Sequence, residues 1–409
     1  MKRRDVLKGL GLLPVGGVVG GMDLLAAPHA SPMAKAATAA AKRDLFKELG
    51  VRTFINATGT LTYMTGSLMH DYVLDAINSS ADRFCLLDEL QDKVGEKIAA
   101  MVHSEAAVVT SGAFSAMTLG LAGILTGMDQ KKVEALPHIE GTGMKSEVIC
   151  QKAHDIVYNH AFINTGCKIV AIETVEELEA AINEKTALLH FLNIAQGGKI
   201  SHEEWVRIGK KHGIPTCIDI AADVPPVSNL WKFNDMGFDM VVISGGKAIR
   251  GPQSAGLLMG RKSIVQAARL HMPPRGFNIG RGMKVNKEEI LGMYVALEHY
   301  LSRDHDKEWK EWEARIDIIE KTVKSVKGVE TKRWVPKGGN ITPNLTVSWE
   351  NTGNAAEGKD LQERLRQGDP SIEVGGGKKS VNVTAWMLKP GEEKIVARRL
   401  KEELQNMLS

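Results

Sequence analysis

Short apolar runs alternate with helical or polar stretches between residues 106 and 259, and this alternation constrains the fold more than any other feature. Stretches with helical spacing or polar character, such as 175–183 and 202–212, separate the runs. Strand, helix and strand at this spacing predict a mainly parallel sheet of seven strands with helices on both faces. The predicted strands are 106–109, 147–150, 169–172, 187–192, 215–220, 240–243 and 255–259.

The residue pattern changes beyond residue 280, where the alternation of short apolar runs ends. A long, charged, nearly glycine-free stretch at 287–326 places apolar residues on helical faces and is predicted to bridge to a second, small α+β domain. We therefore divide the chain into a signal segment, a linker with an N-terminal arm, a large domain, and the bridging helix with the small domain. These parts are 1–36, 37–60, 61–290 and 291–409. The small domain is predicted to hold strands 344–348, 371–374 and 381–387 and helices 359–367 and 392–408.

Composition excludes several classes of function. The 52 basic and 49 acidic residues leave a net charge of +3, too little for the concentrated positive field that nucleic-acid binding needs. The four cysteines are scattered and form no CxxC pair, so neither a metal site nor a disulfide framework is expected.

The N-terminus carries the pattern of an export signal. Residues 3–8 read RRDVLK and precede a glycine-rich, mildly apolar stretch, which resembles the twin-arginine signal, and AKA at 34–36 offers a cleavage site. Pro14, Asp23 and the glycines disfavour a membrane-spanning helix. We expect a periplasmic protein with no stable membrane insertion after cleavage. The alternative is a frayed amphipathic N-terminus.

The strongest local signal for chemistry is VVISGGK at 241–247. A buried strand delivers Lys247 into a glycine-lined turn, where loss of solvent lowers the pKa of an amine and makes it nucleophilic. A surface-loop lysine after a strand is the alternative interpretation.

A second signal is the apolar run PTCIDI at 215–220, which places Asp219 at the end of a strand. Ligands of open α/β sheets collect at the carboxyl ends of strands, so Asp219 and Lys247 can face one crevice. A buried carboxylate needs a positive partner, and the protonated pyridine ring of pyridoxal 5'-phosphate (PLP) provides one and acts as an electron sink. Asp223, which precedes VPP at 224–226, fits better as a capping residue for the next turn.

A third signal is TSGAFSAM at 110–117, where small polar residues stand between a strand and a helix. Free N–H groups of Gly112 and Ala113, with the Ser111 hydroxyl, can form a phosphate cradle. Taken alone, a Ser-Gly pair before a helix is also an ordinary N-cap.

In this order, the phosphate loop, the strand-end aspartate and the strand-end lysine resemble the fold-type I PLP enzymes. A narrower resemblance, to the selenocysteine-synthase-like group that includes an ammonia-lyase of an amino sugar acid, runs from about residue 44 to the C-terminus. The motifs that carry it are FINATGT at 54–60, TSGA at 110–113, DIAA at 219–222, SGGK at 244–247 with GPQ at 251–253, and GRGMKVNKEEI at 280–290.

The resemblance implies roles for particular residues. Lys247 becomes the Schiff-base lysine and Asp219 the partner of the pyridine nitrogen, while Ser111, Gly112, Ala113 and Ser244 become phosphate contacts. Two subunits are expected to build each site in a homodimer or higher homo-oligomer, which brings Arg281 and Lys284 toward a neighbour's cofactor. Of His154, Tyr158 and His160, His160 is our candidate for stacking on the cofactor or handling a proton, with a structural histidine as the alternative.

The chain departs from the group at 368–374, GDPSIEV, which lacks the arginine that members often carry after this turn. If that arginine binds a substrate carboxylate, Arg250 or Arg275 must replace it here, or the substrate differs.

The predicted function is a PLP-dependent lyase that removes the Cα proton of a small amino acid or amino sugar acid and expels a β-substituent, with Lys247 as base. An aminotransferase or a racemase would share the first step, and a non-catalytic periplasmic binding protein could keep the fold. Selenocysteine synthesis itself requires a tRNA partner, which the export signal and the balanced charge disfavour.

Overall fold

The computed structural model describes residues 43–195 and 197–409, which belong to two compact units. The first unit, residues 1–52, contributes helix α1 (Leu45–Leu49), which starts where the Asp44 side chain accepts a hydrogen bond from the Lys47 N–H at 3.1 Å. The proposed signal segment at 1–36 lies outside the described residues. All other described helices and strands belong to the second unit, Thr53–Ser409.

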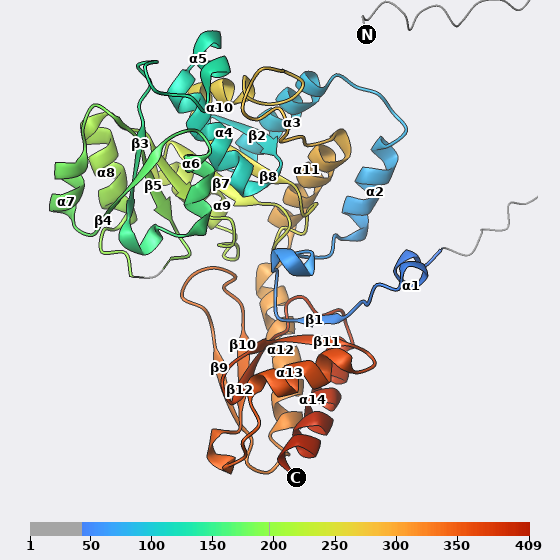
Figure 1. Ribbon diagram of the computed structural model, residues 1–409. Helices are drawn as coiled ribbons and strands as arrows, with labels where there is room; N and C mark the ends of the chain where they lie inside the picture. Colours follow the sequence, from blue (N-terminus) through green and yellow to red (C-terminus); the bar gives the residue numbers. More distant parts are fainter. Residues whose placement is uncertain (1–42, 196) are drawn as a thin grey trace, which may run out of the picture. The chain divides into compact units, whose positions relative to one another are not determined.

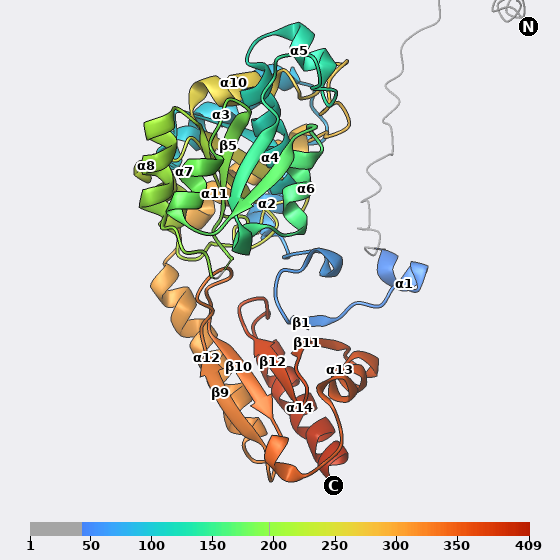
Figure 2. The same ribbon diagram turned by 60° about the vertical axis from the view of Figure 1, so that its left-hand side comes forward.

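A seven-stranded sheet forms the centre of the large domain (Figures 1 and 2). Its order is β2-β8-β7-β6-β5-β3-β4, and β8 runs in the direction opposite to the other six strands. The mostly parallel sheet predicted from the alternation of apolar runs is therefore confirmed. The strands are β2 (Ala106–Thr110), β3 (Glu147–Gln151), β4 (Lys168–Ile172), β5 (Thr186–Leu192), β6 (Thr216–Asp219), β7 (Met240–Ser244) and β8 (Gly256–Gly260).

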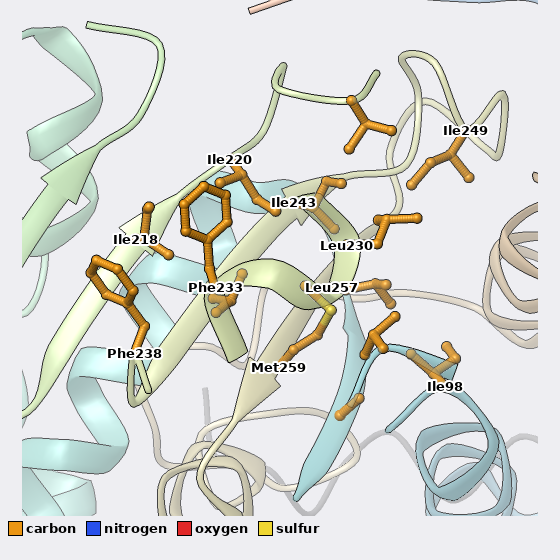
Figure 3. Packing of buried hydrophobic residues seen from close by; sticks show 14 of the residues in the cluster. Ile98, Ile218, Ile220, Leu230, Phe233, Phe238, Ile243, Ile249, Leu257 and Met259 are labelled. Atoms are coloured by element: carbon orange, nitrogen blue, oxygen red, sulfur yellow. The ribbon is translucent and has the colours of Figure 1, made fainter. Parts of the chain in front are cut away.

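Hydrophobic cores cover both faces of this sheet, because successive side chains of a strand point to opposite faces. On β7, Val241 and Ile243 enter one core while Met240 and Val242 enter the other. Figure 3 shows part of the first core, where Phe233 and Phe238 lie near strand residues such as Ile218. The flanking helices are α2 (Asp71–Ser80), α3 (Leu87–Met101), α4 (Gly112–Thr126), α5 (Gln130–Ala135), α6 (His160–Ile163), α7 (Val175–Ala181), α8 (His202–His212), α9 (Asn229–Met236) and α10 (Lys262–Arg269).

The long charged stretch forms two helices instead of one bridge. Helix α11 (Lys287–Ser302) packs on α2 and α3, and helix α12 (His305–Val323) packs on α14 (Glu392–Leu408) of the small domain. The break falls where Asp304 acts as the N-cap of α12 and accepts the Lys307 N–H at 2.9 Å.

The small domain is a five-stranded sheet of order β1-β11-β12-β10-β9. Strand β1 (Ile55–Ala57) comes from the N-terminal arm and pairs in parallel with β11, while the other neighbours are antiparallel. Helices α12, α14 and α13 (Gly358–Gln367) share one core with this sheet. The remaining strands are β9 (Glu330–Trp334), β10 (Asn344–Ser348), β11 (Ile372–Gly376) and β12 (Ser380–Thr384).

Within the described residues, no helix has the length and apolar character that crossing a bilayer requires. The same residues contain no cluster of three or more His, Cys, Asp or Glu side chains suited to a metal ion.

Candidate active site

Lys247 follows β7 through two glycines that the packing requires. A Cβ at Gly246 would lie 2.5 Å from Cα of Gln253, and one at Gly245 would lie 2.4 Å from Sδ of Met293. The turn can therefore approach its neighbours only without side chains. It leaves Lys247 half-buried, and burial lowers the pKa of its amine. No described residue forms a hydrogen bond or ion pair with Nζ of Lys247.

Asp219 ends β6, the strand next to β7 in the sheet, and it pairs in register with Val242. It is 3% exposed, and Oδ1 accepts the Ala221 N–H at 2.8 Å. Burial raises the pKa of Asp219, whereas this hydrogen bond and the positive charge of Lys247 lower it. The structure therefore brings Asp219 and Lys247 into one electrostatic environment at neighbouring strand ends.

Lys247 opens into a cavity of about 240 Å³ that it shares with Ser244 and Ser254. The backbone carbonyl of Ser254 lies 3.7 Å from the position of a Cβ at Gly112, at the start of α4. A Cβ at Gly256 would lie 2.5 Å from the Gly112 carbonyl carbon, so β8 and the start of α4 are in close contact. The remaining lining residues of the cavity are Thr60, Thr62, Gly66, Gly246 and Gln253.

The predicted phosphate loop begins a long helix. Gly112 adopts φ = 89°, and the Ser111 hydroxyl donates to Oγ of Ser115 at 3.0 Å, so it does not cap the helix. The N–H groups of the first turn, including that of Ala113, are thus left for another acceptor. Together, an amine without a hydrogen-bond partner, a buried carboxylate and a helix start border the same strand ends, although Asp219 and the start of α4 are not among the residues that line the cavity of Lys247. These groups would hold the aldehyde, ring nitrogen and phosphate of PLP.

Asp223 has a different role from the turn cap that the sequence indicated. It is 1% exposed, and Oδ1 accepts the Gly339 N–H of the small domain at 2.9 Å. The adjacent Ala222 carbonyl accepts the Asn340 N–H, and the Thr60 hydroxyl donates to Oδ1 of Asn340 at 3.4 Å. Burial raises the pKa of Asp223 to about 6, opposed by the Asn193 side chain. A contact across more than 100 residues left no signal in the local sequence.

His160 and Arg281 are both exposed in the single chain. His160 begins α6, beyond the end of β3, and Arg281 lies between α10 and α11. Neither side chain forms a hydrogen bond or ion pair with Lys247 or Asp219 within the described residues. The buried histidine of this region is His154, whose Nδ1 accepts the Leu192 N–H at 3.3 Å and whose pKa burial lowers to about 4.

The two arginines considered for a substrate carboxylate differ in their partners. Arg275 forms two hydrogen bonds with Asp88, at 3.0 and 3.2 Å, so its charge is already compensated. Arg250 donates to the Trp386 carbonyl at 2.7 Å and has no carboxylate partner in the described chain.

Comparison with known proteins supports the resemblance drawn from the motifs. Residues 86–279 match the family model described as aminotransferase class-V. D-Glucosaminate-6-phosphate ammonia lyase of Salmonella typhimurium is 26% identical over 376 residues, which cover 88% of this chain and 97% of that protein. The 5'-C-glycyluridine monooxygenase-decarboxylase of a Streptomyces species is also 26% identical over 376 residues, which cover 88% and 92%. The solved structure of a D-glucosaminate-6-phosphate ammonia-lyase has a TM-score of 0.79 at 24% identity and covers 90% of this chain and 100% of that chain.

Proposed function

We propose that this chain, whose residues 86–279 match the aminotransferase class-V family model, is a PLP-dependent lyase of fold type I. The proposed reaction removes the Cα proton of a small amino acid or amino sugar acid and expels a β-substituent. The similarity to an ammonia lyase of an amino sugar acid along almost the whole of both chains supports this reaction.

One observation carries the proposal: Lys247, an amine without a hydrogen-bond partner, follows β7, and the buried carboxylate of Asp219 ends the neighbouring strand β6, where the two charges interact. PLP, when bound, supplies a protonated ring that accepts the electron pair of the substrate's Cα–H bond. The Ala221 hydrogen bond and the charge of Lys247 favour the ionised form of Asp219 against the effect of burial, and the carboxylate would keep the proton on the ring nitrogen.

Lys247 has two roles in this proposal. Its amine holds the cofactor covalently, which is possible because burial lowers its pKa and favours the nucleophilic neutral form. Once the substrate's amino group has displaced it, the same amine lies at the strand end as the base that takes the Cα proton. Ser111, Gly112, Ala113 and Ser244 would bind the phosphate.

The direct test supplies D-glucosaminate 6-phosphate and small amino acids to the PLP-loaded enzyme without an oxo-acid acceptor. A lyase is expected to release ammonia and a keto acid in equal amounts. Conversion that requires an acceptor would indicate an aminotransferase, and inversion without ammonia would indicate a racemase. Colourless protein that takes up no PLP would favour a binding protein and would contradict the proposal.

Export by the twin-arginine pathway is part of the proposal and depends on residues 3–8, RRDVLK. Lysine at both Arg3 and Arg4 is expected to keep the protein in the cytosol, whereas the unaltered chain reaches the periplasm with its cofactor. Fractionation followed by immunoblotting measures this, and Arg43→Lys, outside the signal, is the control. Unaltered protein found in the cytosol alone would reject export.

We also propose a homodimer or higher homo-oligomer. Phe84 is fully exposed, Phe277 is 87% exposed and Tyr63 is 83% exposed, and a second copy would cover such side chains. Arg281 and Lys284, both exposed, would then lie toward a neighbour's cofactor. Light scattering is expected to give at least twice the mass of one chain, and a monomer would contradict the proposal.

A further inference from the structure

A second, larger cavity lies where the large and small domains meet. Its volume is about 750 Å³, within the range of small-molecule sites. The residues that follow Lys247, the start of α2, the junction of α11 with α12, and the segment after β12 all contribute to its walls. Its lining combines aromatic and aliphatic surface with arginines: Leu68, Met69, Leu74, Tyr300, Trp312, Trp386, Met387, Arg250, Arg303 and Arg315.

Arg250 is a half-buried cation that forms no ion pair with a described carboxylate. Its backbone has φ = 57°, and its N–H donates to the Lys247 carbonyl at 3.0 Å, so the turn that presents Lys247 also positions Arg250. The guanidinium donates to the Trp386 carbonyl, and no described carboxylate forms an ion pair with it. Charges that are partly removed from water are normally paired, so this arrangement is suited to binding an anion.

The acidic groups around the cavity form no ion pair with Arg250, although the charge of Glu308 partly offsets its own. Glu308 pairs with Arg303 at 3.3 Å, and Glu311 lies 3.9 Å from Arg315. Asp71 is exposed at the start of α2, and Lys389 adds a further exposed positive charge to the rim. Burial and repulsion from Arg303 and Arg315 lower the pKa of Arg250 to about 10, which still leaves it charged at neutral pH.

A second polar group in the same cavity also lacks a partner. Nε2 of His70 is buried and makes no hydrogen bond in the described chain. Burial and the charges of Arg303 and Arg250 lower the pKa of His70 to about 4, so the ring is neutral at pH 7. A neutral imidazole can bond to a ligand hydroxyl or oxyanion and adds no charge of its own.

We propose that this cavity binds a small organic anion, with Arg250 pairing with its carboxylate or phosphate and His70 with an oxygen of the same molecule. The rings of Trp312 and Trp386, whose centroids are 6.4 Å apart, give the ligand's carbon portion an aromatic wall. The anion is either the acidic group of the enzyme's own substrate or a separate metabolite. The first of these two sources rests on the proposed function, whereas the second does not.

Calorimetry of the PLP-loaded enzyme tests the site without requiring turnover. 6-Phosphogluconate is the probe, since it carries a carboxylate and a phosphate but no amine, and sorbitol is its uncharged counterpart. Wild type is expected to bind the probe saturably and to ignore sorbitol. Arg250→Gln is expected to weaken binding at least about tenfold, because it removes a charge-assisted contact. Arg333→Gln, which removes a surface arginine paired with Asp317, is the matched control.

Arg250→Lys keeps the charge and is expected to restore part of the affinity, and far-UV circular dichroism shows whether each variant is folded. Competition against a turned-over substrate identifies the source of the anion: competitive inhibition by 6-phosphogluconate assigns the cavity to the substrate's acidic group, and non-competitive inhibition assigns it to a separate ligand. Absence of saturable binding, or equal binding by folded Arg250→Gln, would overturn the proposal. Neither result depends on whether ammonia is released.

Discussion

Lys247→Ala is expected to abolish turnover, with kcat lower by about 10²- to 10⁴-fold from loss of the base alone. Covalent attachment of PLP should be lost as well, because no other described lysine stands beside Asp219 at the strand ends. Borohydride reduction followed by mass spectrometry checks the attachment, since wild type should gain the mass of one reduced cofactor on the peptide that contains Lys247. Ammonia release at saturating PLP measures turnover.

Lys262→Ala is the matched control for this experiment. Lys262 is exposed at the start of α10, away from the strand ends that hold Asp219 and Lys247. This variant should keep both the label and the rate. If Lys247→Ala retained borohydride-stable cofactor, or turned over within about tenfold of wild type, the assignment of the base and of the attachment site would be wrong.

Much of the fold could be predicted because buried strands and helices require apolar residues at regular positions in the sequence. Except for the edge strand β4, the strands of the large sheet are almost fully buried and read as continuous apolar runs, which is why their predicted and observed bounds agree closely. Strand β9 reads ETKRW and is largely exposed at a sheet edge, so it gives no such pattern. Strand β1 has three residues and is defined by pairing with β11, more than 300 residues away.

In the candidate site, too, residues placed by local apolar patterns could be predicted, whereas residues placed by contacts between distant segments could not. Asp219 and Lys247 were predictable because each stands at the end of an apolar strand, and adjacent parallel strands bring their ends together. Asp223 was not, because its partner Gly339 belongs to the loop between β9 and β10 of the other domain. The unpaired state of Arg250 depends likewise on where the helices α11 and α12 place Glu308 and Arg303. His160 and Arg281 stay predictions, since their proposed partner is a second copy of the chain.

Asp219→Ala is expected to keep the binding of PLP but to slow turnover. Lys247 and the phosphate contacts remain, so the variant should still take up PLP and should still be labelled by borohydride on Lys247. Turnover should fall by about 10²- to 10³-fold, the range found when one preorganised electrostatic contact to a reacting group is removed. Without the carboxylate, nothing at the end of β6 holds the proton on the ring nitrogen.

The pH dependence of turnover distinguishes an electrostatic role of Asp219 at the cofactor ring from a structural role. Burial raises the pKa of Asp219, so the ionised form should be lost, and turnover with it, at a higher pH than for an exposed carboxyl as the solution is acidified. Asp219→Asn preserves the shape and can still accept the Ala221 N–H, yet it cannot ionise. Its rate should be low at every pH, and the acidic limb that belongs to Asp219 should disappear. Asp235→Asn, which alters an exposed carboxylate beside His103, should keep the wild-type profile. A folded Asp219→Asn enzyme with wild-type rate and acidic limb would show that the carboxylate serves packing and not the chemistry of the cofactor ring.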